Sequence, residues 1–283
     1  LEDTLMKSRT WGCKALTLLP LVFFLLLILW IFVFPSKRSA PDATDAQVAS
    51  GVEWLRQQEA NSPADVEAKL KAIRQAELDE KRDEWLAKLR SGEISVWSLF
   101  DDYAMLGDSR TMGFTYYGYL TSDRVFADSG ATIEKVADHL DELIELNPSS
   151  IFLTYGINDV GIGYWPTPED YVNKMSDTLD LLKENLPDAT VYVCSIIPAI
   201  DPAFERGPAW RKIPDYNDAV RAFCEENGTP YVDITQLCEE HTDFYQADGV
   251  HMMSEFYPLW GIELISEVYN YVFVLESTDS AAE

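Results

Sequence analysis

Four polar residues, spread over more than half of the chain, are of the types that cleave an ester. Ser109 stands in a Gly-Asp-Ser motif, and His251 follows Asp248 by three residues. A serine hydroxyl is a weak nucleophile until an imidazole takes its proton, and a carboxylate can orient that imidazole. Asn158, in a Tyr-Gly-Ile-Asn-Asp motif, adds an amide that can donate to an oxyanion. The set predicts acyl transfer through a serine.

The choice of base is narrow because the chain has three histidines. His139 falls within a predicted amphipathic helix and His241 in a polar segment, so we expect both to be surface or packing residues. His251 lies in a predicted loop with Asp248 nearby, where a carboxylate can fix the tautomer of the ring. His251 is therefore the expected base.

Short apolar runs alternate with helical patterns from residue 95 onward. Strands are predicted at residues 103–106, 124–127, 151–155, 191–195 and 231–233, and helices at 133–146, 169–186, 214–227 and 254–274. Such alternation is typical of a parallel sheet covered by helices on both faces, with the chemistry beyond the carboxyl ends of the strands. The candidate residues Ser109, Gly130, Asn158 and His251 follow the first, second, third and fifth predicted strands.

Residues from about 100 to 275 resemble the SGNH hydrolases, also called the GDSL esterase/lipase family. The four matching blocks, in family order, are Met105-Leu106-Gly107-Asp108-Ser109, Asp128-Ser129-Gly130-Ala131-Thr132, Tyr155-Gly156-Ile157-Asn158-Asp159 and Asp248-Gly249-Val250-His251. The resemblance implies a three-layer α/β/α sandwich around a five-stranded parallel sheet, which is the flavodoxin-like SGNH hydrolase fold.

The same resemblance implies roles for individual residues. Ser109 would be the nucleophile, His251 the base and Asp248 the orienting acid. The backbone amides of Ser109 and Gly130 and the side chain of Asn158 would form the oxyanion hole. No metal and no cofactor are expected, because this chemistry needs neither.

Two features depart from the family pattern or add to it. Arg110 replaces the aliphatic residue that usually follows the serine, and we expect it either to bind an anionic part of the substrate or to project into solvent. Tyr164 and Trp165 follow Asn158, and they would either line a sugar-binding cleft or pack as an aromatic plug on the domain.

Charge is distributed unevenly along the chain. Residues 1–90 carry equal numbers of acidic and basic side chains, so the whole net charge of -26 lies in residues 91–283. An acidic domain repels phosphate backbones, which argues against nucleic acid as a partner. Cysteines are few: Cys194, Cys224 and Cys238 are expected to be mostly free and buried, although a bridge between Cys224 and Cys238 is conceivable.

The N-terminal part predicts attachment to a membrane. Residues 15–34 form an uncharged apolar run after a short tail at 1–14, and as a helix the run would be about 30 Å long, enough to span a bilayer. We expect a single-pass signal anchor with the catalytic domain outside the cytoplasm. The basic residues that flank the run slightly favour this orientation. Secretion after signal cleavage is the alternative.

The remaining segments divide as follows. Residues 35–61 lack periodicity and are expected to be a linker, residues 62–92 a helical stalk, residues 95–275 the SGNH hydrolase domain and residues 276–283 a C-terminal tail. The apolar stripe of the stalk is interrupted, so a solvated stalk is favoured over a coiled-coil dimer helix, and the oligomeric partner is unknown.

These observations favour a surface-anchored esterase acting on a small-molecule or glycan ester, with a deacetylase of extracellular carbohydrate as one form. An O-acyltransferase that passes the acyl group to a sugar hydroxyl would use the same residues. A non-catalytic scaffold of the same fold is the third hypothesis.

Overall fold

The computed structural model describes residues 44–59 and 62–279, which divide into two compact units between Leu70 and Lys71. The predicted tail at 1–14 and the apolar run at 15–34 lie outside these residues. Within the described ranges, no helix is long and apolar enough to span a bilayer.

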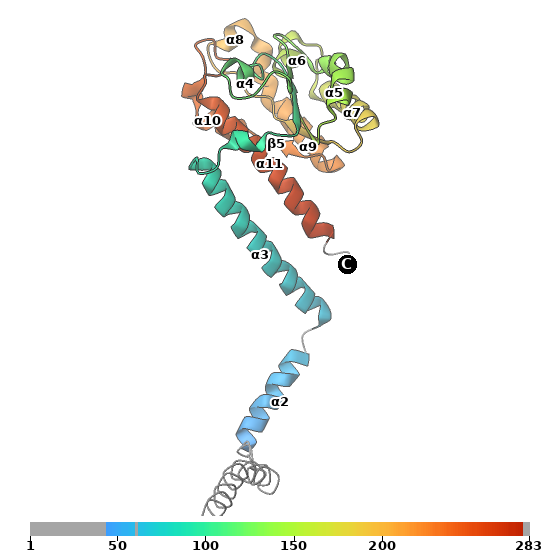
Figure 1. Ribbon diagram of the computed structural model, residues 1–283, viewed down its shortest axis with the longest axis vertical. Helices are drawn as coiled ribbons and strands as arrows, with labels where there is room; N and C mark the ends of the chain where they lie inside the picture. The colour runs from blue at the N-terminus through green and yellow to red at the C-terminus, as the bar shows by residue number, and fades with distance from the viewer. Residues whose placement is uncertain (1–43, 60–61, 280–283) are drawn as a thin grey trace, which may run out of the picture. The chain divides into compact units, whose positions relative to one another are not determined.

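A five-stranded parallel sheet forms the centre of the second unit (Figure 1). Its strands are β1 (Tyr103–Gly107), β2 (Val125–Ala127), β3 (Ser150–Thr154), β4 (Thr190–Cys194) and β5 (Tyr231–Val232), and their order is β2-β1-β3-β4-β5. Every neighbouring pair is parallel. This order is that of flavodoxin-like sheets, so the predicted fold class is confirmed.

Side chains of successive strand residues point to opposite faces of the sheet, which produces two separate cores. Ala104 and Leu106 of β1 pack in one core, whereas Tyr103 and Met105 pack in the other. Two helical layers cover these faces and complete the three-layer sandwich.

The first layer supplies its buried residues from η2 (Ile133–His139), α5 (Leu140–Leu146), α6 (Ile157–Ile162), α7 (Pro168–Asn185), α8 (Ala203–Arg206) and α9 (Ile213–Asn227), with η3 (Pro208–Lys212) packed beside α8 and α9. The second layer supplies them from the end of α3 (Pro63–Arg90), η1 (Val96–Leu99), α4 (Gly113–Tyr116), α10 (Thr235–Glu240) and α11 (Phe256–Asp279), with η4 (Thr242–Phe244) following α10.

The C-terminal end of α3 belongs to the second core. Leu89 is buried there, and the ring centroids of Trp85 and Tyr269 lie 3.9 Å apart. Earlier along the same helix, Leu70 and Ile73 are exposed. The apolar residues at the end of the helix therefore pack against the hydrolase domain, as their spacing indicates.

One expectation about local structure was wrong, and another was confirmed only in part. The segment predicted as a linker at 35–61 contains the helix α2 (Asp45–Glu59), and the predicted helix at 133–146 begins as the 3-10 helix η2. For α2 the physical reason is a capping box that the prediction overlooked. The Thr44 hydroxyl accepts from the amide of Gln47, and the Gln47 side chain accepts from the amide of Thr44.

The C-terminal helix α11 ends at Asp279, so it extends into the segment predicted as a tail at 276–283. Cys194, Cys224 and Cys238 are free and buried, as expected. The conceivable bridge between Cys224 and Cys238 is not formed, because Cys224 packs in the first core and Cys238 in the second.

Candidate active site

The nucleophile candidate lies just beyond the carboxyl end of β1, the second strand in the order of the sheet. Ser109 is partly exposed, while Asp108 before it and Arg110 after it are buried. Gly107 ends the strand where a side chain has no room, because an added Cβ would collide with the side chains of Thr111 and Thr154. Only glycine allows this close approach, which fixes where the turn of Ser109 begins.

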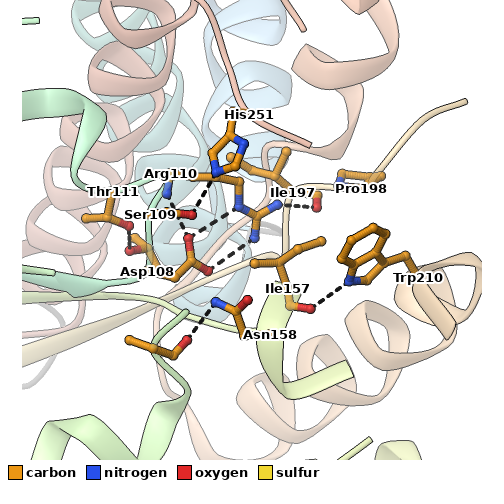
Figure 2. Close-up of polar contacts among 12 residues, drawn as sticks. Asp108, Ser109, Arg110, Thr111, Ile157, Asn158, Ile197, Pro198, Trp210 and His251 are labelled. Carbon is orange, nitrogen blue, oxygen red and sulfur yellow. Dashed lines mark hydrogen bonds and ion pairs between the residues drawn. The ribbon is translucent and has the colours of Figure 1, made fainter. Parts of the chain in front are cut away.

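Ser109, His251 and Asp248 form a continuous hydrogen-bonded chain. The Ser109 Oγ lies 2.9 Å from Nε2 of His251, and Nδ1 of the same ring lies 2.6 Å from Oδ2 of Asp248 (Figure 2 shows the Ser109–His251 contact). In this arrangement the ring can hold a proton on the side of Asp248 and accept one from Ser109. Three residues that the sequence singled out are therefore adjacent in space.

The loop that carries Asp248 and His251 is held by backbone contacts. Oδ1 of Asp248 accepts from the amides of Val250 at 2.9 Å and His251 at 3.0 Å, and its carbonyl accepts from Arg206 at 2.6 Å. Gly249 has a φ of +70° and packs against the carbonyl of Ile200. These contacts fix the orienting carboxylate relative to the ring.

The protonation state of Asp248 follows from the same contacts. Burial favours the neutral carboxyl, but hydrogen bonds from the His251 side chain and from the backbone of His251 and Val250 outweigh it and lower the pKa of Asp248 to about 2. Asp248 is therefore ionised throughout the neutral pH range and can accept a hydrogen bond from the Nδ1–H of His251.

Two of the residues expected to form an oxyanion hole, Asn158 and Gly130, lie in segments that contact each other. Nδ2 of Asn158 donates to the carbonyl of Ala131 at 2.9 Å, which holds Asn158 beside the turn that contains Gly130 (Figure 2). Gly130 has a φ of +76° and is exposed. This contact uses one of the two amide protons of Asn158, so the second is available for a substrate oxygen.

Asp159 makes a second connection between the same two segments. Its Oδ1 accepts from the amide of Ile133 and from Nε1 of Trp165, each at 3.1 Å. The carboxyl group is completely buried, and this burial raises the pKa of Asp159 to about 6. Together with the Asn158 contact, it fastens the Gly130 turn to the start of α6.

Both expectations for Arg110 were wrong. The side chain is 1% exposed, so it neither projects into solvent nor faces a substrate. It lies beneath the turn of Ser109, where its guanidinium contacts Asp108 and donates to the carbonyl of Ile197 (Figure 2). A charged side chain tolerates such burial when it is paired and hydrogen-bonded.

Tyr164 and Trp165 differ in their surroundings. Tyr164 is exposed, whereas Trp165 packs against the first core and donates to Asp159. Trp165 thus behaves as the aromatic plug that was one of the two expectations. A surface pocket of about 480 Å³ is lined by both rings and by residues of α7, including Asn173 and Lys174.

The other two histidines have partners away from Ser109. His139 lies between Asp128 and Glu142, and His241 stacks on the ring of Phe244. Within residues 44–59 and 62–279, no group of three or more His, Cys, Asp or Glu side chains is arranged to hold a metal ion.

Several residues that shape the site were missed by sequence reasoning. The Arg206 side chain and the backbone of the loop at 196–200 donate to backbone carbonyls of the Asp248 loop, and a backbone acceptor leaves no pattern of residue types. The sequence did carry a signal for Asp159, since a carboxyl group beside Asn158 and a few residues after a buried strand is a candidate for a buried hydrogen-bond acceptor.

A parallel α/β sandwich with a Ser-His-Asp chain at the carboxyl ends of its strands defines a hydrolase of the serine esterase class. The sequence profile of the GDSL-like Lipase/Acylhydrolase family matches residues 105–257, which is more than half of the chain. The protein belongs to this family and is a serine ester hydrolase.

Solved structures provide further similarities. A GDSL-like lipase from Bacteroides thetaiotaomicron is 24% identical over 60% of this chain and 88% of its own, with a TM-score of 0.48. A lipase/acylhydrolase from Enterococcus faecalis is 18% identical over 60% and 96%, with a TM-score of 0.48. An acetylxylan esterase from Geobacillus stearothermophilus is 19% identical over 60% and 94%, with a TM-score of 0.45. No curated protein matches the sequence.

Proposed function

We propose that the protein hydrolyses carboxylic esters through an acyl-enzyme formed on Ser109, with His251 as general base and Asp248 as the carboxylate that orients it. The contact of 2.9 Å between Oγ of Ser109 and Nε2 of His251 carries this proposal. Family membership supports the reaction class, and the geometry supports the assignment of roles.

In the first half of the reaction, His251 takes the Ser109 proton while Oγ attacks the ester carbonyl. The resulting oxyanion accepts hydrogen bonds from the Asn158 side chain and from the amides of Ser109 and Gly130. His251 then passes its proton to the departing alcohol as the carbon–oxygen bond breaks, which leaves the acyl group on Ser109. In the second half, water replaces the alcohol, and the free acid is released.

The expected substrate is a small-molecule or carbohydrate ester, and a short acyl group such as acetyl on a sugar is the form we favour. A panel of p-nitrophenyl esters of increasing chain length distinguishes the candidates. Preference for acetate supports a deacetylase, and preference for long chains supports a lipase. Ser109→Ala is the control, and ester hydrolysis by this variant at the wild-type rate would remove the basis of the proposal.

O-acyl transfer is an outcome of the same assay when glycan acceptors are added. Water and a sugar hydroxyl compete for one acyl-enzyme, so the ratio of free acid to acylated glycan measures which reaction dominates. The predicted anchor at residues 15–34 and a catalytic domain outside the cytoplasm remain proposals based on the sequence. Fractionation of cells that express the protein, with protease treatment of intact cells, tests them.

A further inference from the structure

Arg110 lies directly after the proposed nucleophile, and its contacts reach beyond its own turn. Its backbone amide donates to Oδ1 of Asp108 at 2.9 Å, and its Nε and Nη2 approach the two oxygens of the same carboxylate at 3.4 and 3.5 Å. Both side chains are almost completely buried. The pair fixes the backbone on both sides of Ser109.

The remaining arm of the guanidinium connects this turn to another segment. Nη1 of Arg110 donates to the carbonyl of Ile197 at 2.6 Å, across 87 positions in the sequence. Ile197 lies in the loop that follows β4, hereafter the 196–200 loop. The adjacent Ile196 exchanges two hydrogen bonds with the side chain of Asn217 on α9, at 2.8 and 2.9 Å, so this loop is a fixed point of the fold.

The 196–200 loop in turn contacts the segment that carries the base and the acid. The amide of Ile200 donates to the carbonyl of Gly249 at 2.9 Å, and the Tyr245 hydroxyl donates to the carbonyl of Pro198 at 2.8 Å. Gly249 lies between Asp248 and His251. A continuous path of contacts thus joins the turn of Ser109 to the loop of His251, and Figure 2 shows its first part, from Asp108 through Arg110 to the carbonyl of Ile197.

We propose that Arg110 is a positioning residue that holds the Ser109 turn in register with the His251 loop through Asp108 and the carbonyl of Ile197. Arginine suits this task because its planar fork donates in several fixed directions at once, whereas lysine is a single point donor. A third contact supports the same role, since the carbonyl of Arg110 accepts from the Tyr257 hydroxyl of α11 at 2.8 Å. The inference rests on the proposed function, because it concerns the geometry of the same Ser109–His251 pair.

Three variants of the full chain test the role. Arg110→Lys keeps the charge opposite Asp108 but loses the fork. Arg110→Met removes the charge and leaves the buried Asp108 carboxylate without an oppositely charged partner, with only the backbone amide of residue 110 still donating to it. The double variant Asp108→Asn with Arg110→Met removes both charges, so it restores the charge balance without restoring the contact to Ile197. Each is measured for Tm, for kcat and KM on a p-nitrophenyl ester, and for the rate at which a fluorophosphonate labels Ser109.

If Arg110 has a positioning role, changes in kcat and in the labelling rate should not follow changes in Tm. In Arg110→Lys, both rates should fall on the order of 10- to 100-fold, while KM stays within about threefold, because misplacement of the nucleophile affects the chemical step. The double variant should recover Tm relative to Arg110→Met without recovering kcat. Arg124→Met is the matched control, because Arg124 also pairs with an aspartate and donates to a backbone carbonyl, that of Tyr103 at the amino end of the sheet. Its kcat should be unchanged.

Three outcomes overturn the inference: near-normal kcat in Arg110→Lys, recovery of Tm and kcat together in the double variant, or failure of all three variants to fold, which would assign Arg110 to folding alone. The proposed function fails separately, namely when the wild-type protein does not hydrolyse esters or when Ser109→Ala still does.

Discussion

Oγ of Ser109 and Nε2 of His251 lie 2.9 Å apart, although 142 positions separate the two residues in the sequence. Ser109 follows strand β1, and His251 lies in the loop before α11. The parallel sheet makes this meeting possible, because all of its strands end at the same edge. Catalysis should therefore depend on the residues at this edge and also on the contacts that hold those residues in position.

Asn158→Ala should lower kcat on the order of 100- to 1000-fold, because one donor to the developing oxyanion is lost. Binding of the substrate in its ground state should change less, so KM should remain close to its wild-type value. Steady-state kinetics on a p-nitrophenyl ester measure both constants. Asn227→Ala, at an exposed position at the C-terminal end of α9, is the control and should have no effect. Wild-type kcat in the Asn158 variant would exclude this side chain from the oxyanion hole.

The activity should decline between neutral and acidic pH, because only a neutral imidazole can accept the Ser109 proton. Asp248 does not contribute to this decline, since its pKa is lowered to about 2 and the carboxylate stays charged. A profile of kcat/KM against pH checks the expectation. A flat profile across this range would argue against His251 as the base.

Asp248→Asn should reduce kcat on the order of 10⁴-fold, because an amide at this position no longer favours the tautomer of His251 that can accept the serine proton. The fold should persist, since Oδ1 of asparagine can still accept from the amides of Val250 and His251. Circular dichroism verifies the fold, and single-turnover kinetics measure the chemical step. Substantial activity in a folded variant would show that the ring is oriented by other contacts.

Asp159 should make stability depend on pH in an unusual direction. Burial raises the pKa of Asp159 to about 6, whereas an aspartate in an unfolded chain titrates near pH 3.9. Between these values the folded protein keeps a proton that the unfolded chain has lost, so ionisation of Asp159 lowers the free energy of unfolding as the pH rises through this window. Asp159→Asn does not titrate, and the stability of the wild-type protein should therefore decline relative to this variant by on the order of 3 kcal/mol between pH 4 and pH 7.

Denaturant unfolding at a series of pH values measures this difference. Asp215→Asn, which changes an exposed aspartate in the first turn of α9, is the control and should give a curve parallel to that of the wild type. Parallel curves for Asp159→Asn as well would contradict a raised pKa for the buried group.

Gly107→Ala should destabilise the domain by about 1 to 3 kcal/mol, because the new methyl group has to displace Thr111 or Thr154. It should also lower kcat, since Gly107 precedes the turn that presents Ser109. Gly51→Ala is the control: it lies in the middle of α2 with no atom close enough to clash, so it should be neutral or slightly stabilising. Thermal melting measures both, and equal Tm shifts would refute the steric argument.

The sequence predicted the elements that carry the site better than it predicted their support. The alternation of short apolar runs and helical patterns located all five strands, and four motifs at strand ends indicated which side chains meet. Arg110 was misjudged because its neighbours Ser109 and Thr111 are polar. In addition, its main acceptor is a backbone carbonyl, and the presence of such an acceptor cannot be predicted from residue types. The helix α2 was overlooked although Thr44 and Gln47 carry a capping signature. The roles of Gly130 and Asn158 remain predictions.

The three free thiols among the residues that the structure describes lie in different parts of the domain. Cys224 is buried in the first core, whereas Cys194 and Cys238 are buried in the second, and burial raises the pKa of each thiol well above its usual range. A maleimide reacts with the exposed thiolate, so each site should resist alkylation until its own face of the sheet opens. Mass spectrometry of partially alkylated protein would therefore reveal whether the two helical layers separate from the sheet together or one before the other.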